Sequence, residues 1–287
     1  MPDTSVALLR RLSHNSAAYR DPLAYIDWEM FHAECEWLPA PLVSLHGLPE
    51  FDALPEAVRR RLSQYEFINV MLCGLWLERL FLQRLSAQLH PSLARETYEY
   101  LLHELREEAG HSLMFMRAIE ASGLRVPAGA WRPPRVADFV ARHARVSGAL
   151  FWLAVVIAED VPDKYNRRLR QHGAGMHRGV REMATLHLID EARHITFARA
   201  RLDAILAEQG RLGRARLAVA ARLLLRQIAG VLYFPPPTFY ALAGLADGVA
   251  WRNRALRNPL RRQFVEACLA PTARLLHGWG LLEAPRA

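Results

Sequence analysis

Residues 187–194, HLIDEARH, contain the pattern that decides the fold of this chain. Residues 107–111, EEAGH, repeat its second half, so each segment holds a Glu-x-x-His motif directly preceded by another acid. Side chains three positions apart project from one face of an α-helix, so each motif brings a carboxylate and an imidazole to one point. A single Glu-x-x-His is common on helix surfaces. Two of them in the middle of long helical segments predict a shared site between helices.

The pattern of apolar residues and breaks predicts helices throughout the chain. Four long helices are expected, over about residues 55–90, 93–122, 136–171 and 176–209. Pro162 is expected to kink or locally break the third of them. Shorter helices are expected near residues 211–231, 238–247 and 258–278, and the proline-rich residues 36–55 are interpreted as an irregular arm. The sequence therefore predicts one all-α domain over residues 1–287, a four-helix bundle with an N-terminal arm and C-terminal helices.

The composition excludes several classes of protein. Of the 287 residues, 52% are hydrophobic and 23% are charged, which excludes a disordered chain. The longest uninterrupted apolar run, residues 149–158, has ten residues, about half of a membrane span. The first four residues lack the basic-then-apolar pattern of a signal peptide. We therefore expect a soluble, cytoplasmic protein without a membrane partner.

The basic charge is a less specific signal. A net charge of +8 fits an acidic partner such as a nucleic acid. Of the 37 basic residues Lys164 is the one lysine, which leaves 36 arginines and indicates a codon bias as much as a selected surface. Residues 59–61 are three arginines without a recognition motif, so no nucleic-acid partner is expected. The three cysteines have no CxxC spacing, so neither a disulfide framework nor a thiolate metal site is expected.

Two further carboxylates stand where a core helix would carry leucine. Glu78 is the only acidic residue in residues 67–95, and Glu159 directly follows the ten-residue apolar run. Burial of an unpaired carboxylate costs several kcal/mol, so each is expected to have a partner or a metal. If the first two helices pack antiparallel, Glu78 and Glu108 lie within about one helical turn of each other along the bundle. This difference leaves Glu104 as a rival to Glu108 for the place of the ligand. Only Glu108 has a histidine three residues on.

His187 completes a predicted metal site. It lies four residues before Glu191 and seven before His194, on one stripe of the helix. Alone it would be interpreted as a core histidine, but beside two Glu-x-x-His motifs it is predicted to be a ligand. The predicted metal ligands are four carboxylates and three imidazoles: Glu78, Glu108, His111, Glu159, His187, Glu191 and His194. Oxygen and nitrogen ligands without thiolate suit iron or manganese, and this layout is typical of di-iron carboxylate proteins.

The acids directly before the two motifs have a possible supporting role. Glu107 and Asp190 are natural hydrogen-bond acceptors for metal-binding imidazoles. We expect them to act crosswise, Asp190 on His111 and Glu107 on His194. The alternative, held equally open, is an ordinary solvated helix face.

At these seven positions the chain resembles the ferritin-like di-iron N-oxygenases typified by p-aminobenzoate N-oxygenase and the chloramphenicol arylamine oxygenase. That family has three histidines where the usual di-iron oxidase pattern has two, and His187 occupies the place of the extra one. The motif spacing and a Gly-rich turn at residues 172–175 are also similar. The resemblance covers residues 43–206 and implies a ferritin-like bundle.

The resemblance also implies an activity. Two ferrous ions would reduce O2 to a peroxo-bridged diferric species, which would oxidise an amine nitrogen of a small biosynthetic substrate to hydroxylamine, nitroso or nitro level. The chain shows no flavin or nicotinamide fingerprint, so electrons would come from an external donor protein or a small reductant. The amine would be aryl or aliphatic, and a homodimer is expected by analogy with other ferritin-like oxygenases.

The sequence offers several candidate residues for substrate recognition. Gly74 either leaves room for a substrate or marks close helix packing. The candidates for the apolar lining of a substrate cavity are Val70, Leu77, Phe81, Phe115 and Phe151, although core packing explains such residues more often than a cavity does. A cation for an anionic substrate would come from Arg252, Arg254, Arg257, Arg261 or Arg262.

Two alternative functions remain open at this point. A di-iron desaturase or hydroxylase acting on an acyl chain of an acidic carrier protein would suit the basic charge, but it would leave His187 unexplained. A ferritin-like iron-binding protein without oxygenase activity would need only the four long helices. This chain adds about 50 residues before them and about 75 after them.

Overall fold

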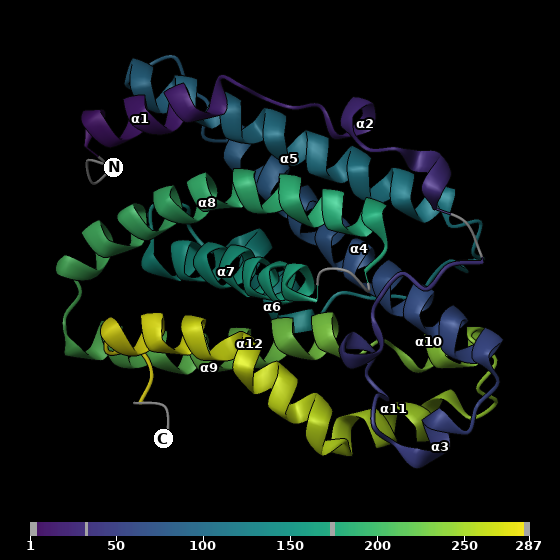
Figure 1. Cartoon of the computed structure of the whole chain (residues 1–287). Helices are drawn as coiled ribbons and strands as arrows, with labels where there is room; N and C mark the ends of the chain where they lie inside the picture. Colours follow the sequence, from purple (N-terminus) through teal and green to yellow (C-terminus); the bar gives the residue numbers. More distant parts are fainter. Residues whose placement is uncertain (1–4, 32–33, 173–175, 284–287) are drawn as a thin grey trace.

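The computed structural model describes residues 5–31, 34–172 and 176–283, and all regular secondary structure in these residues is helical. Four long helices form the centre of the molecule: α4 (Glu56–Ser86), α5 (Arg95–Ala121), α7 (Ala149–Gln171) and α8 (Arg178–Ala207). Helix α4 packs along α5, and α7 packs along α8 (Figure 1). The predicted all-α four-helix bundle is therefore confirmed.

The predicted third helix, residues 136–171, is wrong because it is two helices. Helix α6 (Arg135–His143) ends before an extended segment, and α7 begins after Gly148. The guanidinium of Arg84 on α4 donates hydrogen bonds to the carbonyl groups of Arg142 and Ala144, which satisfies acceptors at the end of α6. The predicted local break at Pro162 is absent, since α7 continues through this residue.

The other three core helices have nearly the predicted bounds. Each is three to five residues shorter in total than predicted, which is the usual uncertainty at helix ends. Helix α5 stops where expected, because Gly123 follows it with a φ of +61°, a conformation that glycine adopts without steric cost. The Gly-rich turn at residues 173–175 lies outside the described residues.

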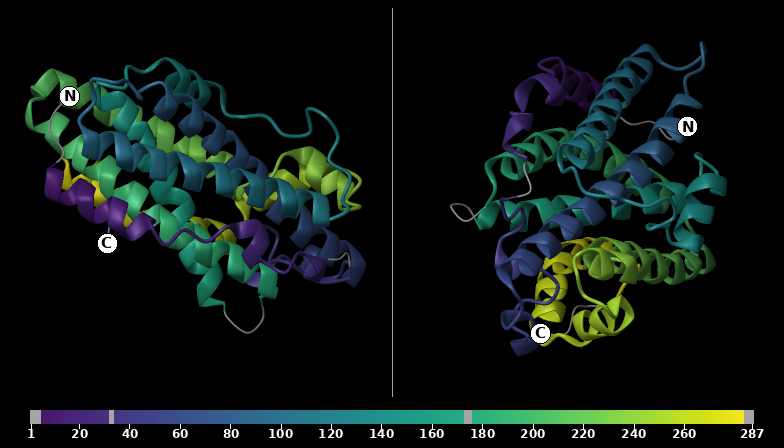
Figure 2. Two further views of the ribbon diagram at one scale, coloured as in Figure 1. Left: turned by 90° about the horizontal axis from the view of Figure 1, so that it is seen from above. Right: turned by 90° about the vertical axis from the view of Figure 1, so that its right-hand side faces the viewer.

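The N-terminal region contains helices for which the sequence analysis gave no prediction, whereas residues 36–55, the predicted irregular arm, contain only two short helical turns. Helices α1 (Val6–Ser16) and α2 (Pro22–Tyr25) lie along α5, and short turns follow at η1 (Trp28–Met30), η2 (Ala40–Leu42) and α3 (Pro49–Asp52). The hydroxyl of Tyr19 reaches the backbone of α5 at Gly110, where a Cβ atom would lie only 2.2 Å from it. The segment from α1 to α2 therefore covers α5 beside its Glu-x-x-His motif. Figure 2 shows the purple N-terminal helices on the outside of the bundle.

Four helices follow the bundle: α9 (Arg211–Tyr233), α10 (Pro237–Leu242), α11 (Gly248–Arg257) and α12 (Pro259–Gly278). Helices α9 and α12 pack against α7 (Figure 1). By length and composition alone, residues 211–242 could cross a membrane, a test that core helices of soluble proteins also pass. One face of α9 buries Leu217, Leu224 and Ile228 in the molecule.

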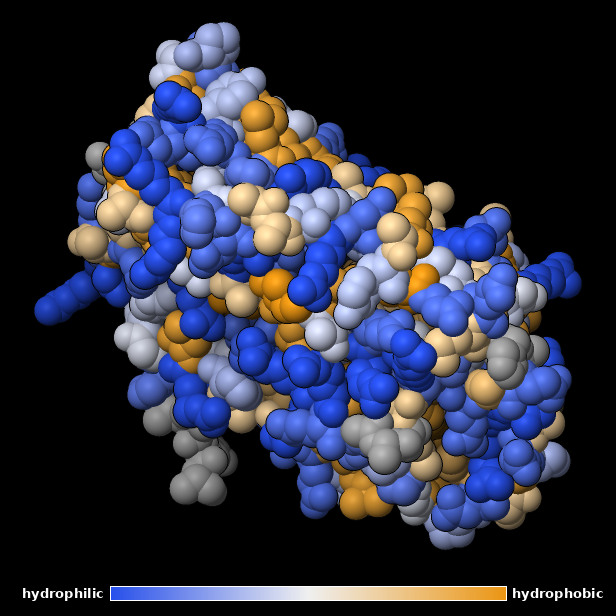
Figure 3. All heavy atoms as spheres, turned by 45° about the horizontal axis from the view of Figure 1, so that its top comes forward, coloured by the Kyte–Doolittle hydropathy of each residue, from blue (hydrophilic) through white to orange (hydrophobic). Residues whose placement is uncertain are grey.

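The outer surface carries most of the arginines. On the face shown in Figure 3, hydrophilic side chains predominate and hydrophobic ones are scattered among them. Scattered exposed apolar residues are normal for folded proteins, so this distribution by itself marks no binding surface.

Candidate metal centre

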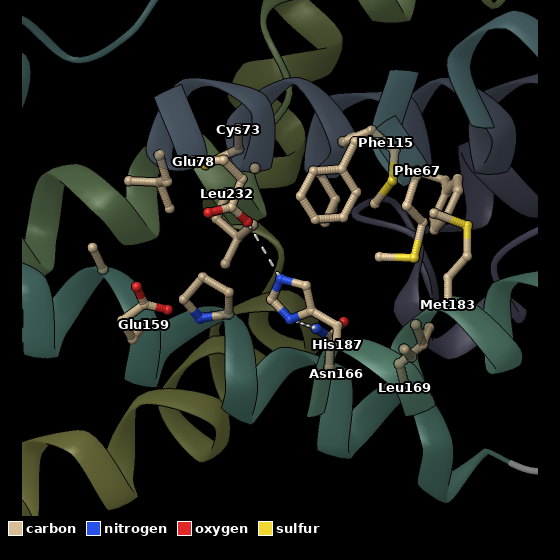
Figure 4. A pocket seen from close by; sticks show the side chains of 18 of the residues that line it. Phe67, Cys73, Glu78, Phe115, Glu159, Asn166, Leu169, Met183, His187 and Leu232 are labelled. Atoms are coloured by element: carbon tan, nitrogen blue, oxygen red, sulfur yellow. Dashed lines mark hydrogen bonds and ion pairs between the residues drawn. The ribbon is translucent and has the colours of Figure 1, made fainter. Parts of the chain in front are cut away.

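The four core helices each contribute to one buried cluster of carboxylates and imidazoles. Glu78 comes from α4 and Glu159 from α7, whereas α5 and α8 supply the two Glu-x-x-His motifs. All seven predicted ligands are at most 6% exposed. In Figure 4, Glu78, Glu159 and His187 face the same space from three different helices.

The seven side chains form two groups that share a residue. In each group, one potential ligand atom per residue lies within 4.8 Å of the others. The first group is Glu78, His111, His187 and Glu191, and the second is Glu108, Glu159, Glu191 and His194. Glu108 also reaches both groups, because its Oε2 lies 3.6 Å from His111 Nδ1 and its Oε1 lies 3.0 Å from His194 Nδ1. Glu108 and Glu191 thus occupy positions between two potential ion sites.

Several polar atoms that face the cluster have no hydrogen bond. Among the described residues, no hydrogen-bond partner is found for Glu78 Oε2, both carboxylate oxygens of Glu108 and Glu191, His111 Nδ1 and His194 Nδ1. Nearly all buried polar groups in proteins form a hydrogen bond. Seven buried atoms without one in a single place therefore require an explanation. Lone pairs of oxygen and imidazole nitrogen facing one space are what a pair of divalent cations would take up. The residues present therefore fit two metal ions.

The opposite nitrogens of two imidazoles are held by acids from the facing helix. His111 Nε2 lies 3.2 Å from Asp190 Oδ2, and His194 Nε2 lies 2.9 Å from Glu107 Oε2. These are the crosswise contacts expected from the sequence. The alternative of a solvated face is wrong, because Glu107 is fully buried and Asp190 is 8% exposed.

Arg193, which the sequence analysis did not single out, joins these two acids. Its Nη2 lies 2.9 Å from Glu107 Oε1 and also contacts Asp190 Oδ1. The sequence did contain a signal for this ion pair, because Arg193 lies three residues after Asp190 on the same helix. Buried carboxylates require a compensating positive charge. The guanidinium of Arg193 supplies it to Glu107 and Asp190 on the side that faces away from the cluster.

The third imidazole has a different neighbour. His187 Nε2 lies 3.4 Å from Glu191 Oε1 and 3.6 Å from Glu78 Oε1. Its Nδ1 lies 3.2 Å from the side-chain amide of Asn166. As placed, the amide Nδ2 of Asn166 faces Nδ1 and donates to it. With the amide rotated by 180°, its oxygen would accept a proton on Nδ1 and leave the Nε2 lone pair facing the cluster. Asn166 was also missed, although it lies seven residues after Glu159 on the same stripe of α7.

The charges of the cluster affect its protonation. Burial raises the pKa of Glu78 and of Glu159 well above the usual range, and the neighbouring carboxylates Glu108 and Glu191 raise it further. Burial would lower the pKa of His111, but the hydrogen bond to Asp190 and the contact with Glu108 raise it to about 10. Burial lowers the pKa of His187, which favours the neutral, ligating form. The cluster as a whole favours a cation, either a proton or a metal ion, in its midst.

The predicted rival Glu104 lies outside both groups. Its side chain is 2% exposed, and burial raises its pKa to about 8. It is buried one turn before Glu108, on the side of the cluster where Tyr100 packs.

A cavity lies directly beside the cluster and has most of the predicted lining. Five predicted residues line it: Val70, Gly74, Leu77, Phe81 and Phe115. Phe151 does not line this cavity and instead lines a neighbouring apolar one, which is a correction. The two cavities share the wall residues Leu77, Phe81 and Ala158.

None of the five candidate arginines lines the cavity, so the predicted source of a substrate-binding cation is wrong. Arg261 is buried elsewhere, where its guanidinium donates to the carbonyls of Tyr233 and Leu42. Arg252 and Arg262 donate to backbone carbonyls of their own region. Backbone acceptors and aromatic rings near the C-terminal helices explain most of these side chains.

The chain is similar in sequence to two mycobacterial proteins. An uncharacterized protein of Mycobacterium tuberculosis (strain CDC 1551 / Oshkosh) is 25% identical over 285 residues, covering 96% of this chain and 83% of the relative. An uncharacterized protein of Mycobacterium bovis (strain ATCC BAA-935 / AF2122/97) has the same identity and coverage.

Two solved structures share the fold. One is an R2-like ligand-binding oxidase mutant with an aerobically reconstituted Mn/Fe cofactor, with a TM-score of 0.57, 16% identity and coverage of 97% of this chain and 93% of that one. Another mutant, with an anaerobically reconstituted Mn/Fe cofactor, has a TM-score of 0.57, 15% identity and coverage of 97% and 92%. At this identity the likeness establishes the ferritin-like helical fold.

Fold, family model and site together indicate an oxidoreductase with the ferritin-like fold, and its clustered side chains could hold two metal ions. Within this class, the model of one family, described as P-aminobenzoate N-oxygenase AurF, matches residues 2–280. The chain therefore belongs to the p-aminobenzoate N-oxygenase family.

Proposed function

We propose that the protein is a di-iron oxygenase that uses O2 to oxidise an amine nitrogen of a small biosynthetic substrate to hydroxylamine, nitroso or nitro level. The observation that carries the proposal is the position of His187, whose Nε2 joins Glu78, His111 and Glu191 as a third imidazole of the cluster. Family membership supports the same activity. Electrons would come from an external protein or a small reductant, and the active species would be a soluble, cytoplasmic chain or homodimer.

In this proposal the seven clustered side chains are the metal ligands. Glu78, His111 and His187 would hold one iron, and Glu159 and His194 the other, with Glu108 and Glu191 between them. When bound, the two irons supply activation of dioxygen and the oxidising equivalents for the amine nitrogen.

The surrounding residues would orient the ligands and exclude water. Asp190 and Glu107 accept the Nε2 protons of His111 and His194, which leaves the Nδ1 lone pairs directed at the cluster. The cavity would hold the substrate with its amine toward Glu78, Glu159 and His187. Its other walls are mainly apolar, which keeps water from the reacting nitrogen.

The alternatives have less support. A desaturase or hydroxylase of carrier-bound acyl chains would suit the charge of +8 and the apolar cavity, but it gives His187 no purpose. An iron-binding protein without oxygenase activity gives no purpose to the cavity beside the cluster.

Isotope-labelled oxygen separates these functions. The full chain is loaded with ferrous iron without oxygen and then exposed to ¹⁸O2 with a reductant, together with amines or with carrier-bound acyl chains. The proposal expects ¹⁸O bound to the amine nitrogen in the product, detected by mass spectrometry. Insertion into a C–H bond, or loss of two hydrogens from an acyl chain, would overturn it.

A further inference from the structure

The cavity beside the cluster is polar at one end only. Its polar end is made by Glu78, Glu159 and His187, which belong to the proposed metal site. Figure 4 shows Phe67, Phe115 and Met183 at some distance from Glu159, toward the other end. The remaining wall is almost entirely apolar, and it includes Met71, Met114, Leu169, Val180 and Leu232.

The cavity offers no partner for an anion. Among its described lining residues none is arginine or lysine, and the one polar side chain outside the cluster is Asn166, which contacts His187. A carboxylate placed among these walls would lose its hydration without a compensating charge or hydrogen bond, which is strongly unfavourable.

The cavity is also small. Its volume is about 40 Å³, so side chains in its wall must move to admit a ring or a short chain. Three methionines of the wall, Met71, Met114 and Met183, can make this movement, because the unbranched thioether has three rotatable bonds. Such a wall adapts to apolar shapes but provides nothing that recognises charge.

Resting on the proposed function, we infer that the substrate is an amine on an uncharged, apolar body and that this chain discriminates against amines that carry a carboxylate. The family is named for p-aminobenzoate, which carries one. For that molecule the amine and the carboxylate lie at opposite ends, so directing the amine to the cluster would bury the carboxylate among Phe67 and Met183. A neutral arylamine meets no such cost.

Matched ligands test the inference on the full-length wild-type protein. Binding of p-toluidine, p-aminobenzoate and methyl p-aminobenzoate is measured by calorimetry and by thermal shift, with and without iron. The ester is larger than the acid but uncharged, so it separates charge from size. We expect both neutral amines to bind at least tenfold more tightly than the acid. Equal or tighter binding of the acid would overturn the inference, and so would absence of binding by every neutral amine.

A charge placed in the wall provides a second test. Met183→Lys introduces an ammonium group of similar length, and Met183→Gln is the uncharged control. The lysine variant is expected to reduce the preference for p-toluidine over p-aminobenzoate at least tenfold, whereas the glutamine variant keeps it. If both folded variants keep the wild-type preference, the apolar wall does not determine it and the inference fails.

Binding and turnover measurements distinguish a failure of this inference from a failure of the proposed function. If neutral amines bind preferentially but the iron-loaded protein forms no N-oxidised product from them, the proposed oxidation is wrong and the ligand preference stands. If N-oxidised product forms from p-aminobenzoate as efficiently as from p-toluidine, the proposed function stands and the inference about the substrate is overturned.

Discussion

The imidazole of His187 lies between the cluster and the cavity. Its Nε2 is within 3.6 Å of two carboxylates, its Nδ1 contacts Asn166, and the ring itself lines the cavity. A core histidine would normally have its polar atoms satisfied by neighbouring donors and acceptors. This position explains how one added histidine would change both the metal's ligands and the space open to a substrate.

Replacing His187 by alanine should weaken one metal site and spare the other. We expect His187→Ala to retain the second group of ligands but to lower the affinity for one of the two metal ions more than tenfold. The exposed His90 provides a control, because His90→Ala removes an imidazole far from the cluster. Chelator competition followed by metal analysis measures both variants. Equal retention of two metals in both would contradict a ligand role for His187.

Glu104 makes the metal-free protein less stable as pH rises. The pKa of this carboxyl is raised from 4.5 to about 8 by burial, so between these values the folded state keeps a proton that the unfolded state has released. Stability is therefore lost with rising pH, at about 1.4 kcal/mol per pH unit for one proton. Glu104→Gln should make the pH dependence shallower by that amount, as measured by urea unfolding of the metal-free protein between pH 5 and pH 8. An unchanged slope would show that Glu104 ionises normally in the folded protein.

Much of the cluster could be predicted at the residue scale because the helix period is regular. Residues spaced by three, four and seven positions share a face, so the motifs at residues 107–111 and 187–194 place their side chains together without knowledge of the fold. Arg193 and Asn166 follow the same spacing but are residue types common on helix surfaces. Their contacts with Glu107 and His187 depend on how neighbouring helices pack, which spacing alone does not fix.

Helix α4 approaches α5 closely at Gly74. A Cβ atom at this position would lie 2.4 Å from Cε2 of Phe115, whose ring also lines the cavity. The interpretation as close helix packing is therefore confirmed, and the glycine also borders the cavity. That it leaves room for a substrate stays a prediction. The contact positions α4 and α5 so that Glu78, one turn later, meets Glu108 and His111.

Gly74→Ala should displace the Phe115 ring into the cavity. Alanine normally stabilises a helix interior by about 1 kcal/mol relative to glycine, but overpacking here should reverse the sign and cost about 1–3 kcal/mol. Ligand binding should fall while metal content stays unchanged. Gly230→Ala on α9 is the matched control, because a Cβ atom there meets no described atom within 4 Å. Equal thermal stabilisation by both substitutions would contradict the close contact.

The break between α6 and α7 shows where element prediction fails. Residues 136–171 have a helical pattern on both sides of residues 144–148, and only Gly148 marks the interruption locally. The carbonyls left at the end of α6 are satisfied by Arg84, which is about 60 positions away in the chain. A contact so distant in sequence cannot be read from local pattern. Pro162, the expected break, is tolerated inside α7.

The C-terminal helices are joined to the bundle by buried polar contacts. The hydroxyl of Thr272 on α12 donates to Asp160 Oδ2 on α7, and Asp160 also receives hydrogen bonds from Lys164 and from Arg199 on α8. Asp160 directly follows the cluster residue Glu159. The residues after the four long helices therefore support the helix that carries one of the predicted ligands, which accounts for part of the additional length.

Removing the Thr272 hydroxyl should loosen this attachment without changing the metal site. Thr272→Val keeps the shape of the side chain but loses a hydrogen bond to a buried carboxylate, which should lower the free energy of unfolding by about 2 kcal/mol. Thr185→Val, whose hydroxyl contacts only its own helix at Arg181, should change it by less than about 0.5 kcal/mol. Chemical denaturation measures both. Loss of metal from the folded Thr272→Val protein would mean that α12 also controls the cluster.

The metal content of the reconstituted chain tests the central claim most directly. The full-length protein is loaded with ferrous iron without oxygen, separated from excess metal, and analysed for iron and protein. Two groups of ligands that share Glu191 predict about two irons per chain, and a coupled pair after oxidation. Substitution of Glu191 by alanine should reduce both the number of irons bound per chain and the fraction of coupled pairs. A wild-type chain that binds one iron or none under these conditions would contradict the account.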